Sequence, residues 1–134
     1  MEFIFSTNHE INVVFSIISD PNFTLHKILG AEVVKVNGNV YEASFTLSLM
    51  VLMIHGVVYS RNDKVSYKFN TIGVNGGEGG FLEFVAMKDG EIRISFEYEG
   101  KLSSFIKFML GRRIAKNIKK LNEEIRLERI KRKI

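Results

Sequence analysis

The residue types that most often carry out chemistry are few in this sequence and form no metal or nucleophile pattern. The chain has no cysteine, which excludes disulfides, thiolate catalysis and cysteine-based zinc sites. Its three histidines, His9, His26 and His55, share no ligand spacing, whereas a 2-His-1-carboxylate iron site needs two His and an acid close together. No Ser/His/Asp grouping is legible either. We therefore expect no metal, no cofactor and no catalytic residue.

A glycine-rich run between residues 73 and 80 resembles a phosphate-binding loop only superficially. A P-loop needs Lys followed by Ser or Thr at the start of a helix, and a dinucleotide fingerprint needs a strand before it and a helix after it. This run lies between two predicted strands and contains no lysine, so it predicts a hairpin loop.

Glu83 is the one acid that would face the core if Phe81 and Val85 pointed inward. The opposite register places Leu82 and Phe84 inside and leaves Glu83 in water. We prefer this register because burying a carboxylate is costly, and general acid–base catalysis then has no strong candidate.

Positive charge is concentrated at the C-terminal end. The chain carries a net charge of +4, yet residues from Lys101 onward hold 12 Lys/Arg against 3 Asp/Glu, and the first hundred hold 7 against 12. A solvated helix face is the favoured interpretation. An anionic membrane surface is the next partner considered, since basic residues are drawn to such surfaces. Nucleic acid is disfavoured, because aromatic residues are not interleaved with these charges as base stacking requires.

No apolar run reaches the roughly 18 to 20 residues that span a bilayer, and the N-terminus lacks the basic region of a signal peptide. A cytoplasmic location is the expectation.

Hydrophobic spacing predicts a strand, two short helices, six strands and a long helix. Residues 2–6 read as a strand. Thr7 and Glu10 form a capping-box pattern before apolar residues at helical spacing, so Glu10 to Ser19 is a predicted helix. Asp20-Pro21 ends it and starts another short helix.

From residue 31 the apolar period changes to two, which is typical of strands. Segments 32–36 and 40–49 flank Asn37-Gly38-Asn39, a hairpin signal. Strands follow at 51–60, 65–71, 81–87 and 92–98. In most of them one face is apolar and the other polar, which indicates an antiparallel sheet covered on one side.

Lys101 to Arg132 is predicted to be one helix roughly 48 Å long, longer than the roughly 36 Å diameter of a globule of this size. Its basic end is therefore expected to overhang the body. The apolar stripe rotates near Gly111, where we expect a bend.

One helix cannot fill the concave face of a strongly twisted sheet, so we expect an apolar cavity between them. Polar contacts to a ligand are considered for His55 and Tyr59, while simple core packing is the alternative for the apolar set. The predicted cavity lining is Phe45, Tyr67, Phe69, Phe96, Tyr98, Phe105, Phe108 and Met109.

Two segments carry a resemblance to a known superfamily: SDPNF at 19–23, and GKLSSFIKFMLGRRIAKNIKKLNEEI at 100–125. With the order of elements, they resemble the helix-grip superfamily of START domains and birch allergens (SRPBCC). More narrowly, the chain resembles a small family of unknown function from thermoacidophilic archaea. The resemblance implies one α+β helix-grip domain over residues 1–134. It has a curved antiparallel sheet of six or seven strands around a long C-terminal helix, with two short helices after the first strand.

The expected function is non-enzymatic binding or transport of an apolar small molecule, such as a lipid or fatty acid. The alternatives are a cyclase- or aromatase-like enzyme, and a protein-interaction module with a filled core. For the last, the doubly apolar strand 51–59 with Leu127 and Ile130 would form a homodimer contact.

Overall fold

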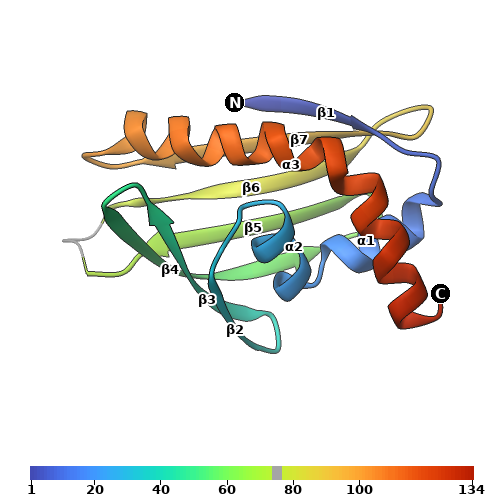
Figure 1. Ribbon diagram of the computed structural model, residues 1–134, viewed down its shortest axis with the longest axis horizontal. Coiled ribbons are helices and arrows are strands. Elements are labelled where there is room, and N and C mark those ends of the chain that lie inside the picture. Colours follow the sequence, from blue (N-terminus) through green and yellow to red (C-terminus); the bar gives the residue numbers. More distant parts are fainter. Residues whose placement is uncertain (74–76) are drawn as a thin grey trace.

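The computed structural model describes residues 1–73 and 77–134, which form one sheet and three helices (Figure 1). In chain order the elements are β1 (Glu2–Ser6), α1 (Ile11–Ile18), α2 (Pro21–Lys27), β2 (Val33–Asn37), β3 (Val40–Leu47), β4 (Met50–Ser60), β5 (Lys64–Thr71), β6 (Gly79–Ala86), β7 (Glu91–Glu99) and α3 (Ser103–Arg132). This order confirms the predicted α+β fold: a curved antiparallel sheet with a long C-terminal helix and two short helices after the first strand.

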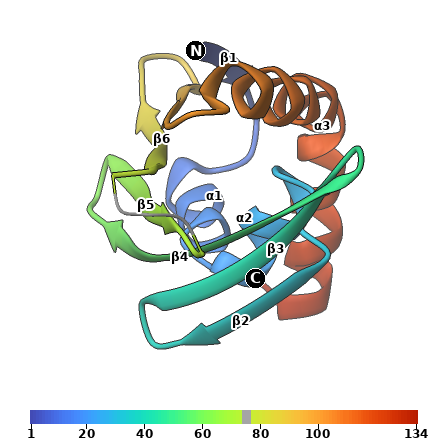
Figure 2. The same ribbon diagram turned by 90° about the vertical axis from the view of Figure 1, so that its left-hand side faces the viewer.

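The seven strands form one antiparallel sheet in the order β1-β7-β6-β5-β4-β3-β2. All three helices lie on one face, which we call the inner face (Figure 2). The strands alternate as expected: Tyr41, Ala43, Phe45 and Leu47 of β3 are buried on the inner face. In β6, Leu82 and Phe84 are buried, so the preferred register of this strand is confirmed.

Two glycines lie in one cross-strand row where the neighbouring backbone leaves no room for a Cβ. The row runs Tyr41, Gly56, Phe69, Gly80, Tyr98 across β3 to β7. A Cβ on Gly56 would lie 2.0 Å from the Lys68 carbonyl oxygen, and one on Gly80 would lie 1.9 Å from the Glu97 carbonyl oxygen. No larger residue fits there without moving the backbone. The aromatic neighbours fill the space above the glycines.

The N-terminal helices pack beneath one half of the inner face. Asp20 caps α2 by accepting a hydrogen bond from the Asn22 backbone N–H at 3.0 Å, as Asp-Pro predicts. The capping box predicted for α1 is wrong. Glu10 is the N-cap but its side chain makes no capping bond, and the Thr7 hydroxyl accepts instead from the His9 N–H at 3.0 Å.

The long helix α3 runs along β7 in its first half and changes direction midway to pass over α1 (Figure 1). Its end does not overhang, contrary to the prediction. Arg132 forms an ion pair with Asp20 at 2.7 Å, and the Arg129 guanidinium lies 3.1 Å from the ring of His9. The length estimate failed because it assumed a straight helix, whereas this one wraps around the body.

No helix in the described residues is both long and apolar enough to cross a membrane.

Candidate functional site at the loop end of the sheet

The strands β3, β5 and β7 run in the same direction and finish at the same end of the sheet, which we call the loop end. This follows from the antiparallel order, in which every second strand is parallel. Figure 2 looks onto the loop end: the β3–β4 hairpin and the first turns of α3 lie in front, and α1 and α2 lie behind. At this end the first half of α3 alone covers the inner face.

Ionic and hydrogen-bonding contacts fix the rotation of α3 over the loop end. On one flank Lys107 pairs with Glu97 of β7 at 3.5 Å. On the other flank the Arg113 guanidinium donates to the carbonyl oxygens of Leu29 at 3.3 Å and Gly30 at 3.2 Å. It also donates to the carbonyl of Thr46, near the end of β3. Arg113 therefore ties α3 both to the chain after α2 and to the β3–β4 hairpin.

The sequence indicated the buried face of α3 only in part, because Phe105 and Phe108 were predicted to line the inner space and are exposed. Ile106, Leu110 and Ile114 are 1% exposed or less, and they define the side that faces the sheet. Phe105 lies about 100° from Ile106 around the helix and is 37% exposed. Phe108 is still further round and is 54% exposed. The two phenylalanines therefore lie outside the packed core of this structure.

Large apolar side chains stay exposed around the whole loop end. They come from three different connections: the β3–β4 hairpin, the residue after β5, and the start of α3. Their exposed fractions are 104% for Leu49, 40% for Ile72, 51% for Leu102, 37% for Phe105 and 54% for Phe108. Leu49 was predicted to continue the buried face of β3, but the strand ends at Leu47 and Ser48 takes a positive φ of 60°. The chain turns there and Leu49 points into solvent.

A polar cluster sits beside this apolar rim. The Tyr98 hydroxyl lies 2.6 Å from the Thr71 hydroxyl and donates to the Glu78 carboxylate at 3.2 Å. The other Glu78 oxygen accepts from the Lys101 backbone N–H at 3.1 Å, just before α3. Burial raises the pKa of the Tyr98 hydroxyl above its usual range. Glu78 thus connects the strand β7 to the start of α3.

The predicted cavity-lining residues fall into two groups. Phe45, Tyr67, Phe69, Phe96 and Tyr98 pack together on the inner face and are at most 5% exposed. The rings of Phe69 and Phe96 stack with centroids 6.4 Å apart, and Tyr98 lies 6.3 Å from Phe69. Met109 is partly buried against this cluster, whereas Phe105 and Phe108 are exposed. Of five hollows in the described residues, none is lined by both the inner face and the first half of α3. That these residues line a ligand cavity stays a prediction.

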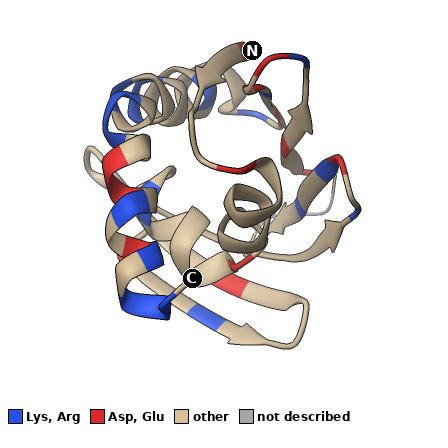
Figure 3. Cartoon of the chain, turned by 90° about the vertical axis from the view of Figure 1, so that its right-hand side faces the viewer, with Lys and Arg blue, Asp and Glu red and all other residues tan. Residues whose placement is uncertain are grey.

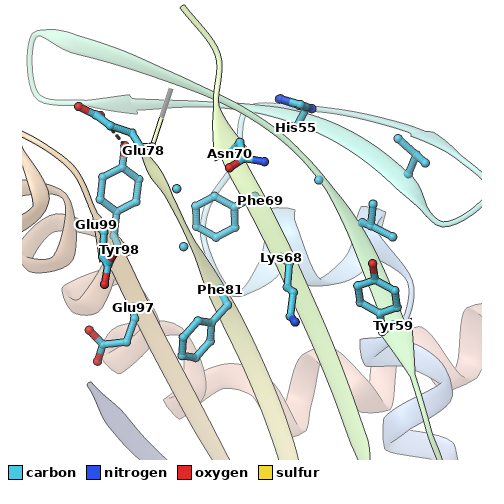
Figure 4. Close-up of a pocket in the computed structure, with 16 residues that line it drawn as sticks. His55, Tyr59, Lys68, Phe69, Asn70, Glu78, Phe81, Glu97, Tyr98 and Glu99 are labelled. Atoms are coloured by element: carbon cyan, nitrogen blue, oxygen red, sulfur yellow. Dashed lines mark hydrogen bonds between the residues drawn. The ribbon is translucent and has the colours of Figure 1, made fainter. Parts of the chain in front are cut away.

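The two residues considered for polar contacts, His55 and Tyr59, lie on the outer face of the sheet. They border an open groove of about 710 Å³ over β4 to β7 (Figure 4). One cross-strand row beneath it runs His55, Asn70, Gly79, Glu99.

The walls of this groove are mixed in charge, and part of that charge is already paired. Lys68 lies over the Tyr59 ring, 5.9 Å from its centroid. Glu97 binds the N-terminal amine and Lys107, and the bond to the N-terminal amine lowers the pKa of the Glu97 carboxyl. Such a groove favours no single class of ligand, whereas the loop end exposes several large apolar side chains.

The remaining hydroxyls of the inner face are held by backbone carbonyls. The Tyr41 hydroxyl donates to the Lys68 carbonyl at 2.9 Å, and the Tyr67 hydroxyl donates to the Ile18 carbonyl. Burial raises the pKa of both hydroxyls far above the usual range. Neither group is placed to act on a substrate as a base near neutral pH.

The histidines lie apart from one another in the structure. His26 bonds the Ala31 carbonyl at 2.8 Å, and His9 lies against α3 at 3.2 Å from the Asn122 carbonyl. In residues 1–73 and 77–134, no group of three or more His, Asp or Glu side chains is arranged to hold a metal ion.

Comparison with known proteins gives a family and a fold. A family model whose description reads only "-like" matches residues 1–134. A solved structure, described as the hypothetical protein from Sulfolobus tokodaii, is 30% identical to the chain, with 100% of this chain and 99% of that chain covered at a TM-score of 0.88. The chain belongs to the family of this Sulfolobus tokodaii protein. Sulfolobus is an archaeal genus, in agreement with the archaeal family named from the sequence.

More distant likenesses place the Sulfolobus family among helix-grip folds. The Aha1 dimer from Colwellia psychrerythraea is 10% identical and matches at a TM-score of 0.60, over 93% of this chain and 94% of that one. Ginseng major latex-like protein 151 from Panax ginseng is 10% identical, at a TM-score of 0.54, over 88% and 92%. No curated protein matches the chain. At such identities the likeness shows the fold alone, which is the predicted helix-grip fold.

The sequence reasoning missed two parts of the loop end. Ile72 directly precedes the glycine run, and the run drew attention to phosphate chemistry rather than to its apolar neighbour. Glu78 lies inside the same run, where a single acid between glycines could have indicated a specific contact.

Proposed function

We propose that this protein binds an apolar or amphipathic small molecule, of the fatty-acid type, at the loop end, without acting on it chemically. The observation that supports the proposal is the exposure of large apolar side chains on both sides of the opening there, Leu49 on the β3–β4 hairpin and Leu102 and Phe105 at the start of α3. Each large apolar side chain left in water forgoes about 1.5–3 kcal/mol of burial free energy. A clustered set of them favours covering by an apolar molecule.

The binding site in this proposal opens between α3 and the β3–β4 hairpin. Arg113 bonds the Thr46 carbonyl, so the residues that follow Thr46 in β3 lie alongside the preceding turns of α3. Met109 and Phe105 are four and eight residues before Arg113, on this flank of the helix. A hydrocarbon chain that enters here would contact Leu49 and Phe105 first and then the aromatic cluster around Phe69.

The charge beside this opening suits an acidic head group. Phe105, Met109, Arg112 and Lys116 follow one another at spacings of four, three and four, so they share one face of α3. Arg112 and Lys116 are exposed. A carboxylate would be stabilised there while its chain lies against the two apolar side chains.

The enzyme alternative has less support, because the hydroxyls of Tyr41 and Tyr67 are engaged by backbone carbonyls. The interaction-module alternative draws on Leu127 and Ile130, which are 47% and 63% exposed. These two residues provide a matched control for the ligand test.

Titration with a dansyl-labelled fatty acid tests the proposal, with unlabelled fatty acids of increasing chain length as competitors. We expect saturable binding that longer chains displace more effectively, since each buried methylene contributes about 0.8 kcal/mol. Phe105→Ser and Leu49→Ser should each weaken binding about tenfold. Ile130→Ser removes another exposed apolar side chain, from the far half of α3, and should leave binding unchanged. Absence of saturable binding, or equal weakening by all three variants, would contradict the proposal.

A further inference from the structure

The first half of α3 exposes aromatic and cationic side chains on one surface. Leu102, Phe105 and Phe108 are 51%, 37% and 54% exposed. The Arg112 guanidinium lies over the Phe108 ring, 5.6 Å from its centroid. We call residues 101–120 of α3 and the turn before it the basic face. Its exposed cations are Lys101, Arg112, Lys116, Lys119 and Lys120.

Five of the seven cations of the basic face, the exposed ones, have no ion-pair partner in the described part of the fold. Residues 101–122 contain seven Lys/Arg and no Asp/Glu. Lys107 pairs with Glu97, and Arg113 is held by carbonyl groups. None of the five exposed cations forms an ion pair within the described part of the chain. Glu78 binds the backbone N–H of Lys101 rather than its side chain.

The second half of α3 shows that this arrangement is local. Arg126 pairs with Glu123 at 2.5 Å, and Arg132 pairs with Glu128 and Asp20, both at 2.7 Å. In Figure 3 blue bands alone mark the first half of α3, whereas blue and red alternate along the second half. Exposed apolar residues occur in both halves, and Lys131 of the second half is likewise in no ion pair within the described residues. The first half differs because it contains no acid at all, so none of its charge is neutralised within the helix.

Three occupants of the basic face can be compared by their chemistry. A second copy of this chain would bring like charges together on this face, which opposes association. A single-stranded nucleic acid would need several aromatic rings placed between the charges for base stacking, and here both rings lie in the first two turns of α3, ahead of most of the cations. An anionic bilayer suits both the cations and the apolar side chains of the basic face. Its head groups attract the cations, and its interfacial region accepts apolar and aromatic side chains.

We propose that the basic face docks on an anionic lipid bilayer, with Phe105 and Phe108 entering the interface and the cations lying against the head groups. This docking goes beyond ligand binding and does not depend on it. It would place the opening between α3 and the β3–β4 hairpin next to the bilayer, into which apolar molecules partition.

Vesicle co-sedimentation of the full chain tests the docking. The vesicles contain phosphatidylcholine alone or mixed with phosphatidylglycerol, and no fatty acid is added. We expect binding only to the mixed vesicles, weakening as salt screens the charges. The triple variant Arg112→Gln, Lys116→Gln, Lys119→Gln should bind about a hundredfold more weakly, at about fivefold per cation. The double variant Phe105→Ser, Phe108→Ser should lose at least about tenfold.

A matched triple variant keeps the test specific. Lys35→Gln, Lys88→Gln and Lys133→Gln lower the net charge by the same amount at exposed positions elsewhere, and should retain most of the binding. Equal loss in both triple variants, equal binding to phosphatidylcholine alone, or tighter binding of a labelled single-stranded oligonucleotide than of vesicles would each overturn the proposal. The fatty-acid titration is done without vesicles, so failure of docking and failure of ligand binding give separate results.

Discussion

The two halves of α3 share one helix but use their side chains differently. In the second half, the Asn122 amide donates to the Ser6 carbonyl at 3.0 Å, and Arg132 binds Asp20 of the α2 cap. Ile125 is fully buried. In the first half, Phe105 and Phe108 are exposed and most cations have no ion-pair partner.

This difference separates side chains that serve the fold from those left over for function. The second half is basic in composition, yet Arg126 and Arg132 pair with acids of α3 itself, and Arg132 also pairs with Asp20 at the start of α2. The first half has a similar number of cations and no acids. The first half of α3 therefore has charge and exposed apolar surface that no other part of the described fold contacts. This is the physical reason for proposing ligand and membrane contacts there.

The largest expected effect is a contrast in stability between neighbouring residues of the first half. Ile114→Ala should lower the free energy of unfolding by about 2–5 kcal/mol, since Ile114 is fully buried and its loss leaves a cavity. Phe108→Ala should change it by less than about 0.5 kcal/mol. Urea denaturation followed by circular dichroism measures both. A large loss on removing Phe108 would mean that this ring belongs to the core.

Two adjacent arginines sharpen the comparison further. Arg113→Met should cost about 1–3 kcal/mol of unfolding free energy, because three backbone carbonyls lose a charged donor. Arg112→Met, with the same loss of charge one residue earlier, should cost nearly nothing. If the two variants unfolded alike in urea, Arg113 would not be the tie between α3 and the β3–β4 hairpin.

The smallest effect concerns the ion pair that joins Glu97 to the N-terminal amine. The amine lowers the pKa of this carboxyl, so its contribution to stability is present above the ordinary Glu pKa of about 4.3 and is lost as the pH falls through the lowered value. Glu97→Gln should therefore be less stable than the natural chain at pH 7 by under about 1 kcal/mol.

The same two proteins should unfold alike once the pH is below about 3. Thermal unfolding between pH 2 and pH 7 would check this, and a difference that grows toward low pH would contradict the assignment.

The sequence was sufficient to predict which side chains of the strands are buried, but not which side of the long helix α3 is buried. The alternation of apolar and polar residues placed Tyr41 and Phe45 on the inner face and Glu83 on the outer face. This succeeds because successive side chains of a strand point to opposite faces of the sheet. The direction of the buried face of α3 depends on contacts from distant elements. Lys107 forms an ion pair with Glu97 of β7, and Arg113 donates a hydrogen bond near the end of β3. These contacts join residues far apart in the sequence, so the local pattern of α3 does not predict them.

The site was also only partly predictable. Aromatic residues of the sheet were identified, but the contacts among their rings, such as the stacking of Phe69 on Phe96, depend on the three-dimensional arrangement of three strands. The exposed position of Leu49 depends on where β3 ends. The alternation of apolar residues predicted a strand to residue 49, whereas β3 ends at Leu47.

Backbone amide NMR shifts on titration with a medium-chain fatty acid test the central claim most directly, because they locate the ligand without mutation. The account predicts the largest shifts in residues 46–50 and 102–109, on both sides of the loop-end opening. Shifts confined to the outer groove around His55 and Lys68, or no saturable shifts at all, would contradict it.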